Sequence, residues 1–460
     1  GLKKFLKSAP AALQHPTPDP AMEPAKFEAL KETLWKFMQE DIYPNEKTFE
    51  HQNEATERAG NEWDHAPILK ELKKKAKSLG LWNLFLPVDS AKLAGYEGAG
   101  LNNLQYSEVC EILGTSSHAE FASECCNCAS PDTGNMEVLA RFGTAEQKEK
   151  WLKPLLEGEI RSCFAMTEPA VASSDASNIG ISIAREGEDY VINGTKWWIT
   201  GAGNINCKIM ILMGKTDPKA SAFKQQSQIL VPMDTPGITL VRAMQTYGHT
   251  DPPKGHFEID FNNVRVPVSN VLLGEGRGFE IAQARLGPGR IHHCMRMLGQ
   301  AERSLSLMCK RVQERQAFGR KLAQFDTILQ DIARSRAEID QGRLLLRTAA
   351  DNMDRLGNAD PYTRQLLSLV KALVPSMVAQ VADRSIQAHG AMGFSQDTML
   401  ASAYMGARWL RMADGPDEVH WRTAGRIELQ RQKDSPLTKH AGHFPVDRTQ
   451  VFRRNPPAKL

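Results

Sequence analysis

The stretch Phe164-Ala165-Met166-Thr167-Glu168-Pro169 marks the change from a helical to a β-rich chain. Before it, apolar residues recur every three or four positions, as in the run from Leu34 to Ile42, which is typical of helices. From Phe164 to about Leu273, β-branched and aromatic runs alternate with turn signals, which is typical of strands. A strand that ends in hydroxyls and backbone amides suits a polar, planar ligand, although a hairpin core followed by a turn explains the same residues.

Turn signals divide the β-rich segment into strands. Asn193-Gly194 lies between Tyr190–Ile192 and Lys196–Ile199, and this pattern predicts a tight hairpin. Asn262-Asn263 indicates a further turn. Four more strands are predicted at residues 209–213, 229–232, 238–241 and 257–261. Together these segments predict a central β domain.

Helical periodicity returns in the last third of the chain. Apolar residues from Leu366 to Val381 fall on one helical stripe, and Asp360-Pro361 supplies an N-cap and a first-turn proline. A second long helix is predicted around Ile328 to Leu346, so the two indicate a helical bundle. The sequence therefore predicts an α+β fold with five parts: a flexible arm (1–24), an N-terminal helical domain (25–163), a central β domain (164–276), a C-terminal helical bundle (277–432) and a polar tail (433–460).

Composition excludes several classes of function. The 460 residues include 57 lysines and arginines and 54 acids, so the net charge is +3 and favours neither nucleic acid nor an anionic membrane surface. The mean hydropathy is −0.40, and no uninterrupted apolar run approaches the ~20 residues that cross a bilayer. We therefore expect no nucleic-acid partner and no membrane span.

Cysteine and histidine spacings do not predict a metal site. The cluster Cys125, Cys126 and Cys128 lacks the paired C-x2-C spacing of zinc sites, so we expect buried, reduced thiols. The pair His292-His293 opens a helical stretch and is better explained by a structural role.

Four motifs occur together in the chain: Phe164–Pro169 (FAMTEP), Ile192–Thr200 (INGTKWWIT), Glu314–Gly319 (ERQAFG) and Gln387–Phe394 (QAHGAMGF). In this order and at this spacing they resemble the acyl-CoA dehydrogenase family. The resemblance extends over about residues 27–429, and the fold it implies is an N-terminal helical domain, a central β domain and a C-terminal four-helix bundle.

The resemblance implies a non-covalent FAD that is bound between two subunits, and hence a dimer or a dimer of dimers. The residues that match flavin-contacting positions are Phe164, Met166, Thr167, Ser173, Trp198, Thr200, Pro416 and Glu418. Arg315, close to Phe318, matches the arginine that meets the FAD pyrophosphate of a neighbouring subunit, for which a planar cationic fork is suited. Gln387 and Gly390 match the stretch that closes over the adenosine half. Without the resemblance, Arg315 would be read as a solvated helix charge.

The same resemblance places the catalytic base at Asp414. The family's usual base is a glutamate followed by Gly and Thr, whereas this chain has Asp414-Gly415-Pro416, and its carboxylate is set back by ~1.5 Å. The family's second position for a base, directly before Arg290, is Gly289. These departures resemble the branch that contains family members ten and eleven. Arg290, Gly415 and Arg426 match positions near the acyl-CoA, although the arginines could equally form salt bridges in the bundle.

The function implied is α,β-dehydrogenation of a medium to long or modified fatty acyl-CoA to a trans-2-enoyl-CoA, in fatty acid β-oxidation. The electron acceptor is a flavoprotein carrier or oxygen. Two alternatives stay open: a nitroalkane-oxidase-like or acyl-CoA-oxidase-like enzyme that uses oxygen, or a catalytically weak family member that acts as a binding or assembly partner. The ending Ala458-Lys459-Leu460 resembles a peroxisomal address, with a mitochondrial or bacterial cytoplasmic location as the alternative.

Overall fold

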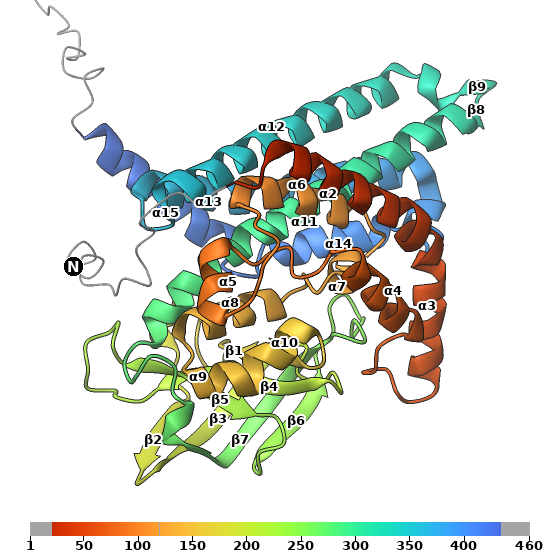
Figure 1. The fold of residues 1–460 in the computed structure, drawn as a ribbon. Coiled ribbons are helices and arrows are strands. Elements are labelled where there is room, and N and C mark those ends of the chain that lie inside the picture. Colours follow the sequence, from red (N-terminus) through yellow and green to blue (C-terminus); the bar gives the residue numbers. More distant parts are fainter. Residues whose placement is uncertain (1–20, 119, 434–460) are drawn as a thin grey trace, which may run out of the picture.

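The computed structural model describes residues 21–118 and 120–433, which form helical parts on either side of a sheet domain in the chain order (Figure 1). The predicted tail and all but the last residues of the predicted N-terminal arm lie outside the described residues. In Figure 1 the orange helices lie between the green-to-blue bundle and the yellow-to-green sheet, whereas the red helices cross the bundle and run down the right-hand side.

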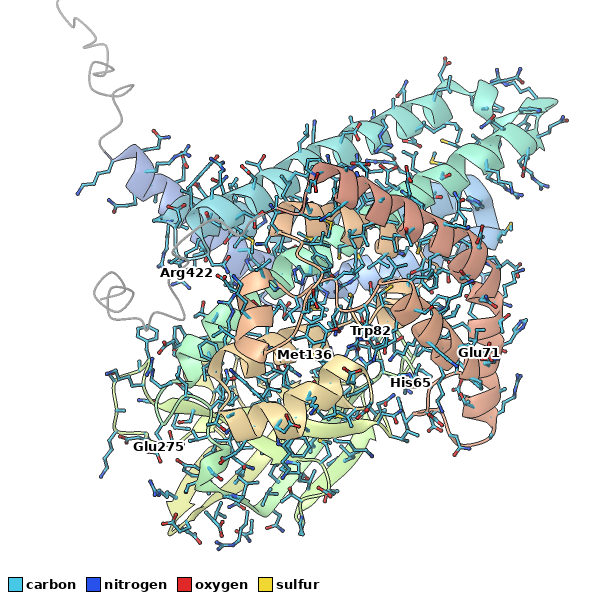
Figure 2. The ribbon with its side chains drawn as sticks, viewed as in Figure 1. His65, Glu71, Trp82, Met136, Glu275 and Arg422 are labelled. Atoms are coloured by element: carbon cyan, nitrogen blue, oxygen red, sulfur yellow. The ribbon has the colours of Figure 1, made fainter. Side chains whose placement is uncertain are left out.

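The N-terminal helices are short and joined by π-helical or irregular turns. They are α2 (Pro24–Phe37), α3 (Tyr43–Arg58), α4 (Pro67–Ser78), α5 (Val88–Ala94), α6 (Asn103–Gly114), α7 (Phe121–Cys125), α8 (Asp132–Phe142), α9 (Ala145–Gln147) and α10 (Lys153–Glu157). Asn102 caps α6, because its side chain accepts the Gln105 backbone N–H at 2.8 Å while Gln105 reaches back to the Asn102 backbone. Met136 is fully buried, and Figure 2 shows its side chain between the helices and the sheet.

The central domain is one mixed sheet. Its strands are β1 (Arg161–Ala165), β2 (Ser182–Glu186), β3 (Asp189–Thr200), β4 (Cys207–Lys215), β5 (Gln226–Pro232), β6 (Ile238–Ala243) and β7 (His256–Pro267). Six of them lie in the order β1-β4-β2-β3-β7-β6, and the seventh, β5, pairs with β4 outside this order. The strand β1, which carries the opening motif, pairs parallel to β4. The motif continues beyond the end of β1, where Met166 packs against a small cluster that includes Ala282 of the C-terminal part of the chain.

Two predicted turns are strands in the structure. The predicted hairpin at Asn193-Gly194 is wrong: β3 runs straight through it, and a register shift against β7 absorbs Gly194 at φ 137°. The hairpin instead joins β2 to β3 around Gly187. The predicted turn at Asn262-Asn263 lies inside β7, where the Asn263 N–H donates to the Asn193 side chain at 2.8 Å. Both asparagine turn signals thus mark bulges that face each other across the β3–β7 ladder.

The C-terminal helices form a bundle around one apolar helix. They are α11 (Gly278–Glu314), α12 (Asp326–Leu356), α13 (Pro361–His389), α14 (Leu400–Leu410) and α15 (Asp417–Gln432). Asp360 caps α13 as predicted, with its carboxylate accepting the Thr363 N–H at 2.8 Å. Helix α13 packs against the other four. Residues 361–394 form a helical stretch that is long and apolar enough to cross a membrane. However, 78% of its apolar 18-residue window is buried inside the protein, as in the core helix of a bundle.

Helices α6 and α11 approach each other closely. A Cβ on Gly299 would lie 2.2 Å from the Glu111 carbonyl oxygen, and one on Gly114 would lie 2.1 Å from the Arg296 carbonyl oxygen. Gln300 donates its side-chain amide to the Gly114 carbonyl across the same contact. Two glycines therefore fix the distance between the N-terminal helices and the bundle.

All eight cysteines are unpaired, and Cys125, Cys126 and Cys128 are buried as predicted. Burial raises the pKa of each of these three thiols. Within the described part of the chain, no group of three or more His, Cys, Asp or Glu side chains is arranged to hold a metal ion.

Candidate functional site

The structure brings the first two motifs together at the bundle-facing end of the sheet. Phe164 lies in β1, Met166 and Thr167 follow it directly, and all three are partly buried. The Trp197 backbone N–H donates to the Thr167 carbonyl at 3.1 Å, which ties this stretch to β3. Ser173 accepts the Glu168 N–H at 2.9 Å and closes the loop.

A buried ion pair holds this loop in place. Lys196 is fully buried and donates from Nζ to the Glu168 carboxylate at 2.8 Å and to the Met166 and Met213 carbonyls at 2.7 Å. The Glu168 carboxylate in turn accepts the Ile181 N–H at 2.8 Å. Burial lowers the pKa of Lys196 to about 8, while Glu168 opposes that shift. The pair therefore fixes the backbone that follows β1.

The end of β3 is shaped for a ligand as well. Its pairing with β7 is interrupted between Lys196 and Ile199, and Trp198 sits in the left-handed region at φ 56°. The Thr200 hydroxyl is 2.9 Å from Nδ1 of His256, whose ring stacks on Trp409 at 5.4 Å between centroids. Burial lowers the pKa of His256 to about 4, so the ring is neutral at neutral pH. These contacts connect the sheet to the end of α14.

Asp414 lies just beyond α14, in the turn that leads into α15. It has a left-handed backbone at φ 56°, followed by Gly415 at φ 106°. Its carbonyl accepts a hydrogen bond from Arg290 Nε at 3.1 Å, and His420 Nε2 lies 3.3 Å from the same oxygen. Its side chain is 21% exposed, and Oδ2 lies 3.5 Å from His293 Nε2. The tertiary contacts, not local propensity, therefore hold this carboxylate in its strained turn.

Several cations surround this carboxylate. Lys371, fully buried on α13, donates to the Gly415 carbonyl at 3.4 Å, and burial lowers its pKa. Burial likewise lowers the pKa of Arg290 and of Arg285, and Asp414 opposes both shifts. The guanidinium of Arg285 lies 4.1 Å from the centre of the Phe164 ring. Arg285 thus covers the ring of the first motif while its charge interacts with that of Asp414.

The other residues predicted near Asp414 differ in their placement. A Cβ on Gly289 would lie 3.8 Å from Asp414 Oδ2, so the family's second base position adjoins the first. Pro416 is the N-cap residue of α15, and Glu418 is exposed in its first turn. Arg426 is exposed further along α15. Arg290 touches the Asp414 backbone directly, which favours a supporting role over a surface salt bridge.

A second group of predicted cofactor residues lies at the far end of the bundle. Arg315 and Phe318 belong to a hairpin formed by β8 (Gln316–Ala317) and β9 (Arg320–Lys321). Phe318 is 95% exposed, and Arg315, Gln387 and Gly390 are exposed too. Figure 1 shows this hairpin, in green at the upper right, well away from the sheet at the lower left. Within one chain the two groups of predicted residues do not meet.

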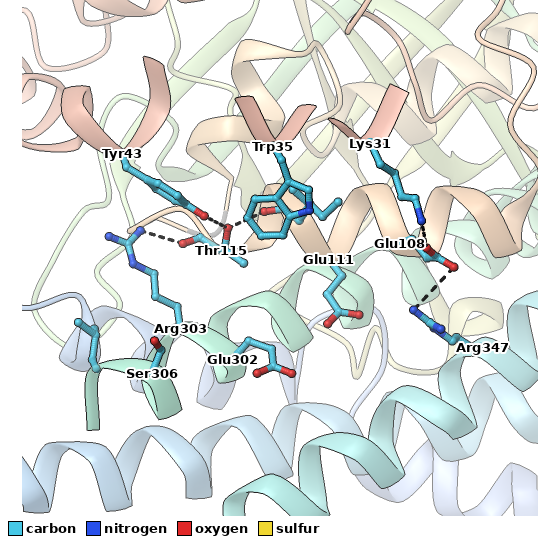
Figure 3. A pocket seen from close by; sticks show the side chains of 12 residues that line it. Lys31, Trp35, Tyr43, Glu108, Glu111, Thr115, Glu302, Arg303, Ser306 and Arg347 are labelled. Carbon is cyan, nitrogen blue, oxygen red and sulfur yellow. Dashed lines mark hydrogen bonds and ion pairs between the residues drawn. The ribbon is translucent and has the colours of Figure 1, made fainter. Parts of the chain in front are cut away.

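A well-defined cavity lies elsewhere in the described part of the chain. It measures about 790 Å³ between α2, α6, α11 and α12, and none of the predicted site residues lines it (Figure 3). Its charged side chains are paired within the chain, for example Lys31 with Glu108 at 2.9 Å and Arg303 with Glu46. Because the charged side chains around this cavity are already paired with one another, they give no reason to place the catalytic site there.

The sequence prediction missed four residues that build the site: Lys196, Glu168, His293 and Arg296. His292 and His293 lie inside α11 instead of opening a helix; the ring of His292 is 4.7 Å from that of Tyr106, and Nε2 of His293 faces Asp414. Arg290, His293 and Arg296 recur every third residue, which places them on one face of a helix. That spacing was the available signal.

The first group of residues fits an FAD. Trp198 leaves the ladder in a left-handed conformation, the Thr167 loop is tethered by a buried ion pair, and the side chains between them are aromatic, thioether or hydroxyl groups. Such a surface suits a planar, polar ring system without adding a competing charge. Phe164, Met166, Thr167, Ser173, Trp198 and Thr200 would hold the flavin part.

Comparison with known proteins agrees with this arrangement. Family models match the N-terminal domain (residues 24–159), the middle domain (163–264) and the C-terminal domain (276–429) of acyl-CoA dehydrogenases. The chain is 52% identical to FadE2 of Mycobacterium tuberculosis, over 89% of this chain and 97% of that protein. It is 54% identical to mouse acyl-CoA dehydrogenase family member 10 over 88% of this chain, and 48% identical to human member 11 over 86%. It spans only 37% and 49% of those two proteins.

Solved structures show the same fold. A candidate acyl-CoA dehydrogenase from Mycobacterium abscessus is 45% identical with a TM-score of 0.83, and covers 89% of this chain and 99% of its own. Butyryl-CoA dehydrogenase from Megasphaera elsdenii is 26% identical with a TM-score of 0.72, and covers 89% and 100%. This chain belongs to the acyl-CoA dehydrogenase family of oxidoreductases.

Proposed function

We propose that this chain is an FAD-dependent acyl-CoA dehydrogenase in which Asp414 removes the α-proton of a fatty acyl-CoA. The observation that carries the proposal is the position of the Asp414 carboxylate, which is only 21% exposed and lies within electrostatic range of Arg285, the residue whose guanidinium covers the Phe164 ring. A base must be held within a fraction of an ångström of its proton, and Arg290 and His420 hold the Asp414 backbone.

The chain's own groups perform most of the reaction. The Asp414 carboxylate takes the α-proton, and the adjacent Gly415 amide donates to the thioester carbonyl as negative charge develops there. Arg290 and Lys371 fix the carbonyls of Asp414 and Gly415, so this turn does not need to reorganise during the step. FAD, when bound, supplies the acceptor for the β-hydride.

The exposed second group supports a shared cofactor site. One end of the bundle, at the β8–β9 hairpin, carries Arg315, Phe318, Gln387 and Gly390. This end lies far from the part of the same chain that would hold the flavin, which is Phe164, Met166, Thr167, Ser173, Trp198 and Thr200. A dimer, or a dimer of dimers, would bring this end of one copy to the sheet of another, where Arg315 would meet the FAD pyrophosphate. On α15, Arg426 would meet the substrate and Glu418 the cofactor. An exposed Phe318 would then be covered by the second copy.

The substrate, the pathway and the electron acceptor follow from the resemblance alone. We infer a medium to long or modified acyl chain, β-oxidation as the pathway and a flavoprotein carrier or oxygen as electron acceptor.

The decisive experiment follows flavin bleaching by acyl-CoAs without oxygen. We expect Asp414→Ala to lose about 10²- to 10⁴-fold in the reductive rate while it keeps FAD, because it lacks the base. Asp234→Ala, which removes an exposed carboxylate from a turn of the β domain, should bleach at the wild-type rate. In Asp414→Ala with Gly289→Glu, the new carboxylate starts beside the lost one and should restore part of the rate. Wild-type bleaching by Asp414→Ala, or bleaching of the wild type by nitroalkanes but by no acyl-CoA, would contradict the proposal.

A further inference from the structure

Helix α11 places a histidine between the Asp414 carboxylate and a buried arginine. Arg290, His293 and Arg296 lie on one face of α11 at three-residue spacing. Nε2 of His293 faces Asp414 Oδ2 at 3.5 Å, and its Nδ1 lies 2.9 Å from a terminal nitrogen of Arg296. The ring thus bridges the carboxylate and the guanidinium.

Arg296 decides which ring nitrogen carries the proton. A guanidinium has only donors, so Nδ1 of His293 must accept from it. A neutral ring has one proton, which then sits on Nε2 and points to Asp414. Burial, together with Arg296 and Lys254, lowers the pKa of His293 well below its ordinary value of 6.5, so the ring is neutral at neutral pH.

Arg296 is itself held firmly. It is nearly fully buried, and its guanidinium pairs with the Glu120 carboxylate at 3.2 Å. Glu120 also binds Lys254 and accepts the Ser130 hydroxyl at 2.7 Å. The backbone of Arg296 lies against Gly114, where no side chain would fit. The network from Glu120 to Arg296 therefore gives the His293 ring a fixed orientation.

We propose that His293 is a positioning residue, which donates its Nε2–H to the Asp414 carboxylate and holds it toward the substrate, with Arg296 setting the tautomer. This inference rests on Asp414 being the base. The 3.5 Å separation is longer than a relaxed hydrogen bond, and such catalytic contacts commonly tighten when substrate binds. A carboxylate on a short side chain gains most from a fixed partner, because its reach cannot be corrected by a longer stem.

Other charged groups face the same carboxylate. Arg285 and Arg290 approach from α11, Lys371 from α13 and His420 from α15. Arg290 and His420 contact the Asp414 main-chain carbonyl, and Lys371 contacts the carbonyls of Leu410 and Gly415. We expect each of these groups to have the same charge in a His293 variant as in the wild type. The change measured in the variant therefore reports the loss of the imidazole donor.

The first test is kinetic and uses the FAD-loaded enzyme. We expect His293→Leu to lower kcat about 10- to 100-fold with little change in KM. Losses of this size are typical when a residue is removed that orients a group in direct contact with the ligand. The acidic limb of kcat/KM should move to higher pH, since the carboxylate loses a donor that favours its ionised form. His293→Gln, which keeps an N–H donor, should recover part of both. His292→Phe, which preserves the edge contact with Tyr106, should leave both unchanged.

The second test needs no turnover. In ring-¹⁵N-labelled wild-type enzyme, the His293 signal, assigned by its loss in His293→Gln, should show the proton on Nε2 between pH 6 and 8, and Arg296→Met should remove that preference. A proton on Nδ1, or a His293→Leu enzyme with wild-type kcat and pH profile, would overturn the inference. If Asp414→Ala bleaches normally while the tautomer is as expected, the proposed function fails and the network stands as a structural one.

Discussion

Lys196 is the clearest case of a single residue whose importance comes from burial. Its ammonium has no exposed surface and is shared by the Glu168 carboxylate and the carbonyls of Met166 and Met213. A buried ion pair adds little net stability compared with an apolar pair, but removing one partner leaves an uncompensated charge. The pair therefore acts as a brace on the loop that is proposed to face the flavin.

We expect Lys196→Met to lower the free energy of unfolding by ~3–5 kcal/mol, because Glu168 is left buried without its cation. Urea unfolding in excess FAD measures this loss, and FAD retention on dialysis should fall with it. The double variant Lys196→Met with Glu168→Gln removes both charges and should recover part of the stability. If Lys196→Met and the wild type had the same free energy of unfolding, the ion pair would not be needed for stability and this expectation would be wrong.

At the scale of elements, the contact between α6 and α11 sets the geometry of the site. Gly114 and Gly299 let the two helices approach until a Cβ on either would collide with backbone. That contact supports Arg296, and through it the ring of His293. The absence of side chains at Gly114 and Gly299 thus helps to position the residues that face Asp414.

We expect Gly299→Ala to destabilise the protein by at least ~1–3 kcal/mol, since its methyl group would meet rigid backbone of α6. Gly425→Ala is the matched control: it lies in α15 with nothing within 4 Å of its Cβ, and should stabilise by up to ~1 kcal/mol. Thermal unfolding of the two variants compares them directly. Similar shifts of Tm in both would disprove the steric argument.

The β8–β9 hairpin is the element that most suggests a partner. Phe318 is 95% exposed and has a left-handed backbone at φ 50°, a costly arrangement for a surface loop without a covering surface. We expect Phe318→Ser to shift the enzyme toward smaller species in analytical ultracentrifugation and to weaken FAD retention. Ile205→Ser, which removes an exposed apolar side chain near the sheet, should leave both unchanged. An unaltered sedimentation profile for Phe318→Ser would argue against this end of the bundle as an interface.

At the scale of the whole molecule, buried neutral histidines make the fold sensitive to acid. Burial lowers the pKa of His65, His256 and His420 to about 4 and that of His292 to about 3. Between pH 6.5 and about 4 the unfolded chain binds protons that the folded chain excludes, so stability falls as the pH falls.

We therefore expect the urea midpoint to decrease from pH 7 to pH 5, with each such histidine contributing up to ~1.4 kcal/mol per pH unit. Asp132, Asp251 and Asp354, whose pKa is raised by burial, oppose this trend, because the folded chain takes up their protons at a higher pH than the unfolded chain. His65→Leu removes a ring whose two nitrogens have no hydrogen-bond partner, and should flatten the slope. A midpoint that is constant or rises toward pH 5 would contradict this expectation.

The sequence by itself determined the order of the domains, the long bundle helices and the family, because these depend on local periodicity and on motif residues at fixed spacing. The stripe from Leu366 to Val381 becomes part of the largely buried helix α13, although Leu373 within it is 41% exposed. It also indicated Asp414 through its place in a motif. The asparagine turn signals failed, because pairing between β3 and β7 converted them into bulges.

Only the tertiary structure decided what surrounds Asp414. Lys371 from α13 and Arg290 and His293 from α11 meet the turn that carries Asp414 and leads to His420 in α15, although the three helices are separate in the chain. No local pattern encodes that convergence, because it depends on how α11, α13 and α15 pack. The left-handed backbone of Asp414 is likewise a tertiary result: a non-glycine residue adopts it here because Arg290 holds its carbonyl in place.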